Sequence, residues 1–277
     1  MSTPWRRLGT IGAVLLLAGS AAGFGPGTAT EMKSVEVIDP LFNRVAFRVT
    51  IPADWVFDGT VLREGSWPMF AFRASSPDRL SGLQLLPMYR WVSTNDSTER
   101  QRLESERATI MPYITAADFV TRHLLADARP GATVIGPEAV VDAQALTIAD
   151  YAKNRAYDVQ MTTTRRHQRT DAARFRIAYE IDGHPVDEAI IAIKTSTSER
   201  RGMEPKSVER TTVTVTAARA PRGALDSTMS RLVAVSKSIS IDTAWMARQY
   251  AFARDNATRT AAPSDVRATR DNWILVR

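Results

Sequence analysis

The stretch Arg176–Ile193, RIAYEIDGHPVDEAIIAI, decides the fold. Apolar side chains alternate with polar ones before Asp182-Gly183, and a second apolar run follows this pair, which is the pattern of a β-hairpin. We expect a three-residue loop, Ile181–Gly183, in which Gly183 takes the left-handed conformation that glycine adopts without steric penalty. The stretch therefore predicts two antiparallel strands of a larger sheet.

The length of this loop sets which side chains face each other. A three-residue loop places Glu180 opposite His184 and Arg176 opposite Glu188, and each such pair of opposite charges contributes about 0.2–1 kcal/mol. A two-residue loop would put charged and apolar residues on the same face, which is penalised where only one face is buried. We therefore predict that the charged residues lie on the exposed face of the hairpin.

The same charged residues also support a catalytic interpretation. Glu180, His184 and Glu188 would form an acid–base cluster if His184 were a base oriented by Glu180, because proton transfer requires a titrating group held within hydrogen-bonding reach of a partner. A hairpin tip is exposed, however, and exposed ion pairs shift a pKa only slightly. The sequence therefore favours exposed charged side chains without a catalytic role at this hairpin.

Apolar patterns outside the hairpin predict further strands and helices. The expected strands have period-two alternation and the expected helices have helical spacing between a cap and a breaker. The strands lie within 43–57, 69–74, 82–92 and 210–220, and the helices begin at Thr115, Asp142, Leu225 and Asp242. We predict one α+β domain over residues 34–258, a mostly antiparallel β-sheet covered by helices on one face.

The N-terminus has the pattern of an export signal. Arg6 and Arg7 precede a short apolar run and then small residues near Ser20, which predicts a secretory signal peptide over residues 1–24. An uncleaved anchor is the alternative, but the run is shorter than the roughly 20 residues that span a bilayer. With a linker at 25–33 and a tail at 259–277, we expect an exported protein, periplasmic or extracellular, with no membrane span in the mature chain.

Composition excludes several classes of protein. The chain has no cysteine, so the fold cannot depend on disulfides. Its formal net charge of +6 falls to +4 without Arg6 and Arg7, and its charged stretches mix both signs. Mixed runs are typical of solvated loops and helix faces. We therefore expect no nucleic-acid partner.

Known catalytic and metal-binding motifs are absent from the sequence. The three histidines, His123, His167 and His184, form neither HExxH nor HxH, and no EF-hand spacing is present. The chain also lacks a GxxxxGK[ST] loop, a GxSxG elbow and an SxxK pair. We expect no metal and no cofactor, although carboxylate-based enzymes carry no local signature.

Tryptophans provide two other candidate sites. Trp55, Trp67 and Trp91 lie near predicted strand ends and would line a ligand groove, unless they only pack in the core and at its rim. The apolar run Trp273, Ile274, Leu275 and Val276 directly precedes the last residue of the sequence, Arg277. It would dock on the domain, as an edge strand or by packing, or serve as a handle for a partner.

Three stretches carry a family resemblance. FRVTIPADWVF (47–57), LQLLPMYRWV (83–92) and LDSTMSRLVAVSKSISID (225–242) resemble the opening strands and the closing helix of the PsbP/Mog1-like family. The resemblance implies a sandwich around an antiparallel sheet and an accessory, adaptor or assembly role. It carries no catalytic residues onto this chain.

Two functional hypotheses follow from the sequence. The first is an exported, soluble, non-catalytic envelope protein that binds an envelope protein or a small ligand. The alternative is a periplasmic or secreted enzyme that uses Glu180, His184 and Glu188. The burial of these three side chains separates the two hypotheses.

Overall fold

The computed structural model describes residues 31–64, 66–138, 164–201, 207–256 and 273. The predicted signal peptide, the helix predicted from Asp142, and Ile274, Leu275 and Val276 lie outside the described residues.

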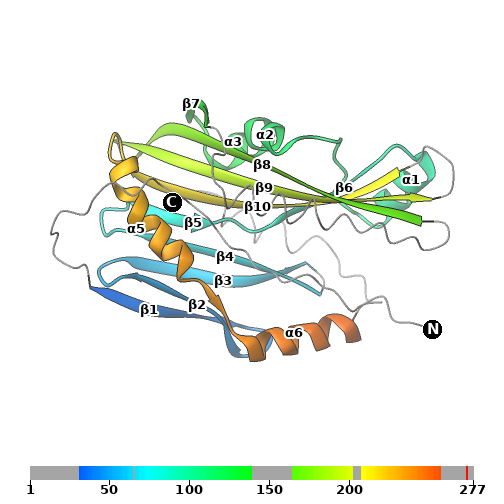
Figure 1. Ribbon diagram of the computed structural model, residues 1–277, viewed down its shortest axis with the longest axis horizontal. Coiled ribbons are helices and arrows are strands. Elements are labelled where there is room, and N and C mark those ends of the chain that lie inside the picture. Colours follow the sequence, from blue (N-terminus) through cyan, green and yellow to red (C-terminus); the bar gives the residue numbers. More distant parts are fainter. Residues whose placement is uncertain (1–30, 65, 139–163, 202–206, 257–272, 274–277) are drawn as a thin grey trace.

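Strands dominate the described chain (Figure 1). They are β1 (Met32–Asp39), β2 (Arg44–Pro52), β3 (Val56–Glu64), β4 (Trp67–Ser75), β5 (Gly82–Leu85), β6 (Tyr89–Thr94), β7 (Thr133–Glu138), β8 (Thr164–Ile181), β9 (His184–Arg201), β10 (Ser207–Pro221) and β11 (Ser240–Ile241). The helices are α1 (Ser97–Ser105), α2 (Ala116–Phe119), the π-helical turn η1 (Val120–Leu124), α3 (Leu125–Ala128), α5 (Leu225–Lys237) and α6 (Thr243–Asp255).

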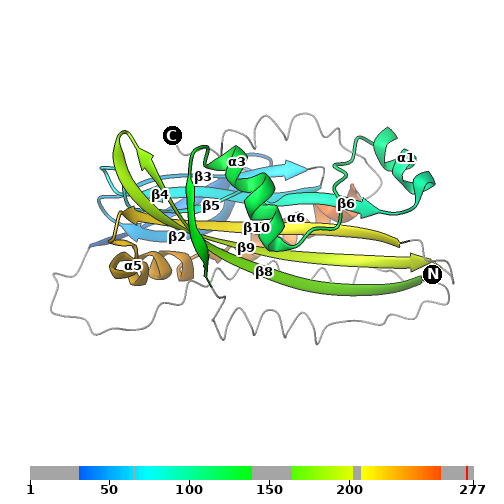
Figure 2. The same ribbon diagram turned by 90° about the horizontal axis from the view of Figure 1, so that it is seen from above.

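The strands form two antiparallel sheets. The larger one has the order β3-β4-β5-β10-β9-β8-β7, and β6 pairs with β10 beyond β5, so that β5 and β6 act as one interrupted strand. The smaller sheet has the order β1-β2-β11. The long strands β8, β9 and β10 run side by side, and α1 lies near the end of β6 (Figure 2). The prediction of a mostly antiparallel α+β fold is confirmed.

Both faces of the larger sheet are buried. One face packs against the smaller sheet, α5 and α6 in a core that contains Phe47, Phe72 and Trp245. The other face packs against α2, η1 and α3 in a second core that contains Phe119 and Ile190. Figure 1 shows α2 and α3 on one side of β8–β10 and α5 on the other. The prediction that helices cover only one face is wrong, and this error affects the interpretation of the hairpin.

The three predicted helices that lie in the described part of the chain begin where the sequence places them, and two of them have a side-chain cap. Thr115 caps α2 as expected and forms a capping box with Asp118, in which Thr115 Oγ1 accepts from the N–H of Asp118 at 3.0 Å. Asp242 caps α6 by accepting from the N–H of Trp245 at 2.8 Å. α5 has no side-chain cap, because the carboxylate of Asp226 in its first turn binds Arg176 instead.

Several elements were not predicted. β1 begins at Met32, inside the stretch that was expected to be a linker, and β3, β7 and α1 are also new. Asp39 at the end of β1 is fully buried and accepts from the indole N–H of Trp245 at 2.7 Å and from Arg63. This carboxylate links the smaller sheet to α6. None of the described helices combines the length and apolarity needed to cross a membrane.

Candidate functional site

The central hairpin has a different register from the predicted one. β8 and β9 are joined by the two-residue turn Asp182-Gly183, with φ of 50° and 79°. These values match the type I′ turn, whose twist suits antiparallel strands. Ile181 therefore pairs with His184 and Ile177 with Glu188. The predicted three-residue loop is wrong, and so are the predicted Glu180–His184 and Arg176–Glu188 pairs.

The burial of both sheet faces explains the error. A two-residue loop places Glu188 on the same face as Ile177, which is unfavourable where only one face of the hairpin is buried. In the structure, every other residue of β9 enters one core and the alternate ones enter the other: Ile190 lies in the core with α2 and α3, while Ala189 lies in the core with α5. Apolar side chains are accommodated on either face, so the pattern alone does not define an exposed one.

Glu188 is held in a buried ion pair. Its carboxylate accepts from Arg129, the residue that follows α3, with Nε–Oε2 at 2.6 Å and Nη2–Oε1 at 2.9 Å. Both side chains are 1% exposed. Burial alone would lower the pKa of Arg129, but the charge and hydrogen bonds of Glu188 outweigh it and hold the pKa above its usual value. The predicted partner, Arg176, binds Glu138 and Asp226 instead.

Two neutral side chains complete this buried cluster. Arg129 Nη2 also donates to Gln84 Oε1 on β5 at 2.9 Å, and its guanidinium lies 6.0 Å from the ring centroid of Tyr179. Burial, followed by the negative charge of Glu188, raises the pKa of Tyr179. The carboxylate of Glu188 is thus fixed by a bidentate cation beneath a helix end, and this geometry opposes proton transfer to a substrate.

The other two catalytic candidates lie apart from Glu188. Glu180 and His184 are both exposed near the hairpin tip. Side chains alternate across a strand, so Glu180, which pairs with Pro185, projects to the face opposite that of Glu188. The structure therefore does not bring the three residues into one cluster. Among the described residues, no group of three or more His, Asp or Glu side chains is placed to hold a metal ion.

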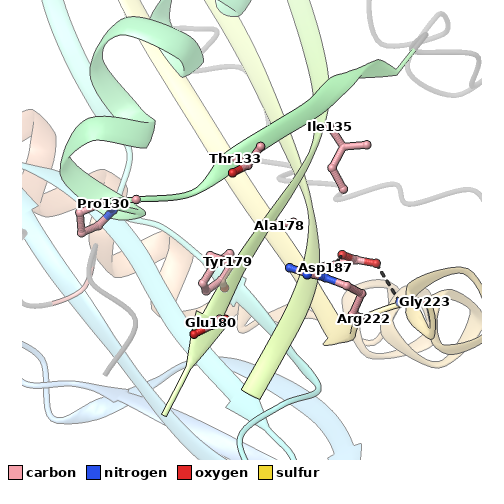
Figure 3. Close-up of a pocket in the computed structure, with 10 residues that line it drawn as sticks. Pro130, Thr133, Ile135, Ala178, Tyr179, Glu180, Asp187, Arg222 and Gly223 are labelled. Atoms are coloured by element: carbon pink, nitrogen blue, oxygen red, sulfur yellow. Dashed lines mark hydrogen bonds and ion pairs between the residues drawn. The ribbon is translucent and has the colours of Figure 1, made fainter. Parts of the chain in front are cut away.

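An open pocket of about 810 Å³ lies beside the hairpin tip (Figure 3). Residues of β7, β8, β9 and the two adjoining turns line it: Pro130, Gly131, Thr133, Ile135, Ala178, Tyr179, Glu180, Asp187, Arg222 and Gly223. Asp187 is largely buried, accepts from the N–H of Gly223 at 2.9 Å, and lies 3.6 Å from Arg222 Nε. The lining mixes an apolar wall with both signs of charge, which suits binding of a mixed-polarity ligand.

The three candidate tryptophans occupy three different environments. Trp55 lies in the core with α5 and α6, and Trp91 lies in the core on the other face, stacked on Phe119 at 5.4 Å. Trp67 is 43% exposed, with the guanidinium of Arg90 at 5.2 Å from its ring centroid. The structure does not bring the three rings together.

Trp273 of the C-terminal tail docks on the larger sheet. The residue is 9% exposed, and its side chain packs with Leu62, Met69, Ala71 and Met88. Its main-chain carbonyl accepts from Gln84 Nε2 at 2.6 Å. Gln84 thus connects the docked tail to the buried Arg129–Glu188 pair.

Sequence reasoning missed Arg129 and Gln84. Arg129 stands just before Pro130-Gly131, where a cation at a helix end usually meets solvent. Its partner Glu188 opens an apolar run, and a charged residue at that place in a strand is a weak signal of a buried pair. No local pattern joins residues that are 59 positions apart.

Comparisons with known proteins add little. No family model matches the chain, and no curated protein matches it. Among solved structures, the solution structure of cyanobacterial PsbP (CyanoP) from Synechocystis sp. PCC 6803 aligns with 81% of this chain and 100% of its own, at 10% identity and a TM-score of 0.23. This neighbour bears the family name suggested by the sequence resemblance, but a likeness at this TM-score carries no argument about function.

Proposed function

We propose that this protein is an exported, non-catalytic envelope protein that binds a protein or a small ligand, as an accessory or adaptor of the PsbP/Mog1-like sandwich type. The bidentate hold of Arg129 on Glu188 carries the proposal. It removes the one buried carboxylate of the catalytic hypothesis from reach of any substrate. Glu180 and His184, exposed on opposite faces of the hairpin, lack the shared partner that acid–base catalysis needs.

The open pocket beside the hairpin is the proposed binding site. Ile135, 57% exposed on the edge strand β7, provides an apolar contact, and Glu180 and Arg222 provide charges at the rim. Such a lining supports recognition through a few polar contacts on an apolar wall. Export rests on the sequence of residues 1–24.

Site-specific photo-crosslinking in the native host tests the binding function. A photoreactive amino acid at Ile135 should give a discrete adduct, and the same group at Glu104 on α1, also exposed, should not. The adduct should persist when His184→Ala is added. Loss of the Ile135 adduct, or turnover of the captured ligand that His184→Ala abolishes, would overturn the proposal.

Cell fractionation tests the export part separately. The full chain should be recovered with the envelope or the medium, and a chain without residues 1–24 should stay in the cytoplasm. Identical distributions of the two chains would refute export through this segment.

A further inference from the structure

The surface under Trp273 has the composition of a recognition site. Its floor consists of Leu62, Met69, Ala71 and Met88, and two polar side chains, Arg73 and Gln84, stand beside each other on neighbouring strands. We call this set of six residues the tryptophan groove. The groove shares no lining residue with the pocket described above.

Gln84 is oriented before any tail residue binds. The guanidinium of Arg129 only donates hydrogen bonds, so the oxygen of the Gln84 amide must face it, as the 2.9 Å contact shows. The amide nitrogen then points toward the groove, where it meets the carbonyl of Trp273. Because Gln84 is buried, an empty groove would leave this donor without an acceptor.

Arg73 provides selectivity for an aromatic ring. Its guanidinium lies 4.9 Å from the ring centroid of Trp273, and a carboxylate, Asp58, lies 3.2 Å from its Nη2. Cation–π attraction is strongest for tryptophan among the aromatic side chains. A leucine or valine would fill the apolar floor but would lose this contact.

These contacts recognise one kind of ligand. In the groove, Arg73 contacts an indole ring and Gln84 donates to the main-chain carbonyl of the same residue. These two contacts together select a peptide over a free aromatic molecule that lacks such a carbonyl. We propose that the tryptophan groove binds a tryptophan-bearing peptide segment of a partner protein, and that the chain's own C-terminal segment occupies it as an intramolecular competitor.

The tether sets the strength of this competition. Residues 256–272 join α6 to Trp273, and a tether of that length gives an effective concentration on the order of a millimolar. To displace the tail, a partner peptide needs either a concentration above this effective concentration or a correspondingly higher affinity for the groove than the tail has. Removing the indole of the tail should therefore expose the groove without altering its walls.

Fluorescence anisotropy with a labelled synthetic peptide tests the proposal. The probe is residues 268–277, ATRDNWILVR, added to the full chain and to its Trp273→Ala variant. We expect the variant to bind the peptide roughly tenfold or more tightly than the unaltered chain, because the tethered competitor is lost. A peptide with alanine in place of tryptophan should not bind either protein.

Matched substitutions locate the binding. In the Trp273→Ala background, Arg73→Ala should raise the dissociation constant of the peptide roughly two- to fivefold, because the cation–π contact is lost. Arg90→Ala removes a similar arginine from above another ring, that of Trp67, and should leave the affinity unchanged. Circular dichroism verifies that each variant is folded. If Trp273→Ala does not fold, Trp273→Phe replaces it and should give an intermediate gain in affinity.

Three results would overturn the inference. The first is equal affinity of the unaltered chain and the Trp273 variant for the peptide. The second is the absence of saturable binding up to about a millimolar peptide. The third is equal binding of the peptide with tryptophan and the peptide with alanine in its place. Sedimentation gives a fourth outcome: we expect a monomer, and a dimer that Trp273→Ala dissociates would show that a second copy supplies the segment.

Discussion

Replacement of Glu188 by glutamine tests the buried ion pair directly. The substitution keeps the size of the side chain and removes its charge, so Arg129 remains as a cation that is 1% exposed and has lost its counter-charge. A guanidinium cannot escape this penalty by releasing a proton. Breaking a buried pair in this way costs about 3–5 kcal/mol. Glu180→Gln, on the same hairpin but exposed, should change stability by about 0.5 kcal/mol or less.

A double substitution separates the charge from the packing. Arg129→Met with Glu188→Met removes both charges and retains apolar volume, and such replacements of buried pairs are often neutral or stabilising. Gln84 Oε1 would lose its donor, which costs about 1–3 kcal/mol. We therefore expect the double variant to unfold at a urea concentration above that of Glu188→Gln, although it carries one more substitution.

Urea unfolding followed by tryptophan fluorescence and circular dichroism measures all four proteins. The two signals must give coincident transitions for the free energies to be compared. A loss below about 1 kcal/mol for Glu188→Gln would show that the pair is solvated, because exposed ion pairs contribute no more than that. That result would refute the burial argument and would again make Glu188 available for chemistry.

Two further predictions concern the same hairpin. Burial, reinforced by Glu188, raises the pKa of Tyr179, so the folded protein keeps the phenol proton where the unfolded chain loses it; this stability is complete below about pH 10 and declines as the pH rises further. Tyr179→Phe should flatten the decline in urea midpoint between pH 8 and pH 11, whereas Tyr113→Phe, at an exposed position, should leave its slope unchanged. Gly183→Ala should destabilise by about 1–2 kcal/mol, because φ is +79° and an added Cβ meets no atom within 4 Å, so the strain is in the backbone alone. Gly183→Asn should lose less in the same urea assay, and equal losses would contradict this account.

Local signals in the sequence were reliable where the structure depends on local chemistry. The capping box at Thr115 and the cap at Asp242 follow from hydrogen bonds between residues three positions apart. The alternation that predicted β2 reflects burial of one side of that strand against the larger sheet. The turn at Asp182-Gly183 was also located correctly, since few residues adopt a positive φ.

The features that sequence reasoning missed depend on distant parts of the chain. The register of the hairpin is set by what covers each face of the sheet, and the covering elements, α3 and α5, lie before and after the hairpin in the sequence. The partner of Glu188 comes from a helix end on another layer. The docking of Trp273 depends on Gln84, whose orientation in turn depends on Arg129. No window of neighbouring residues contains these relations.

The buried pair itself supplies the information that the apolar pattern lacks. Ile190 and Ile191 show that β9 presents apolar side chains to both cores, so hydrophobicity scarcely distinguishes the two registers. A slip of one residue would turn Glu188 to the opposite face and leave Arg129 as an unpaired buried cation, a penalty of about 3–5 kcal/mol. That penalty exceeds the roughly 0.2–1 kcal/mol that each cross-strand pair of the rejected register would contribute. In a strand buried on both sides, the charged residue specifies the register, and the same contact then fixes Gln84 toward the tail.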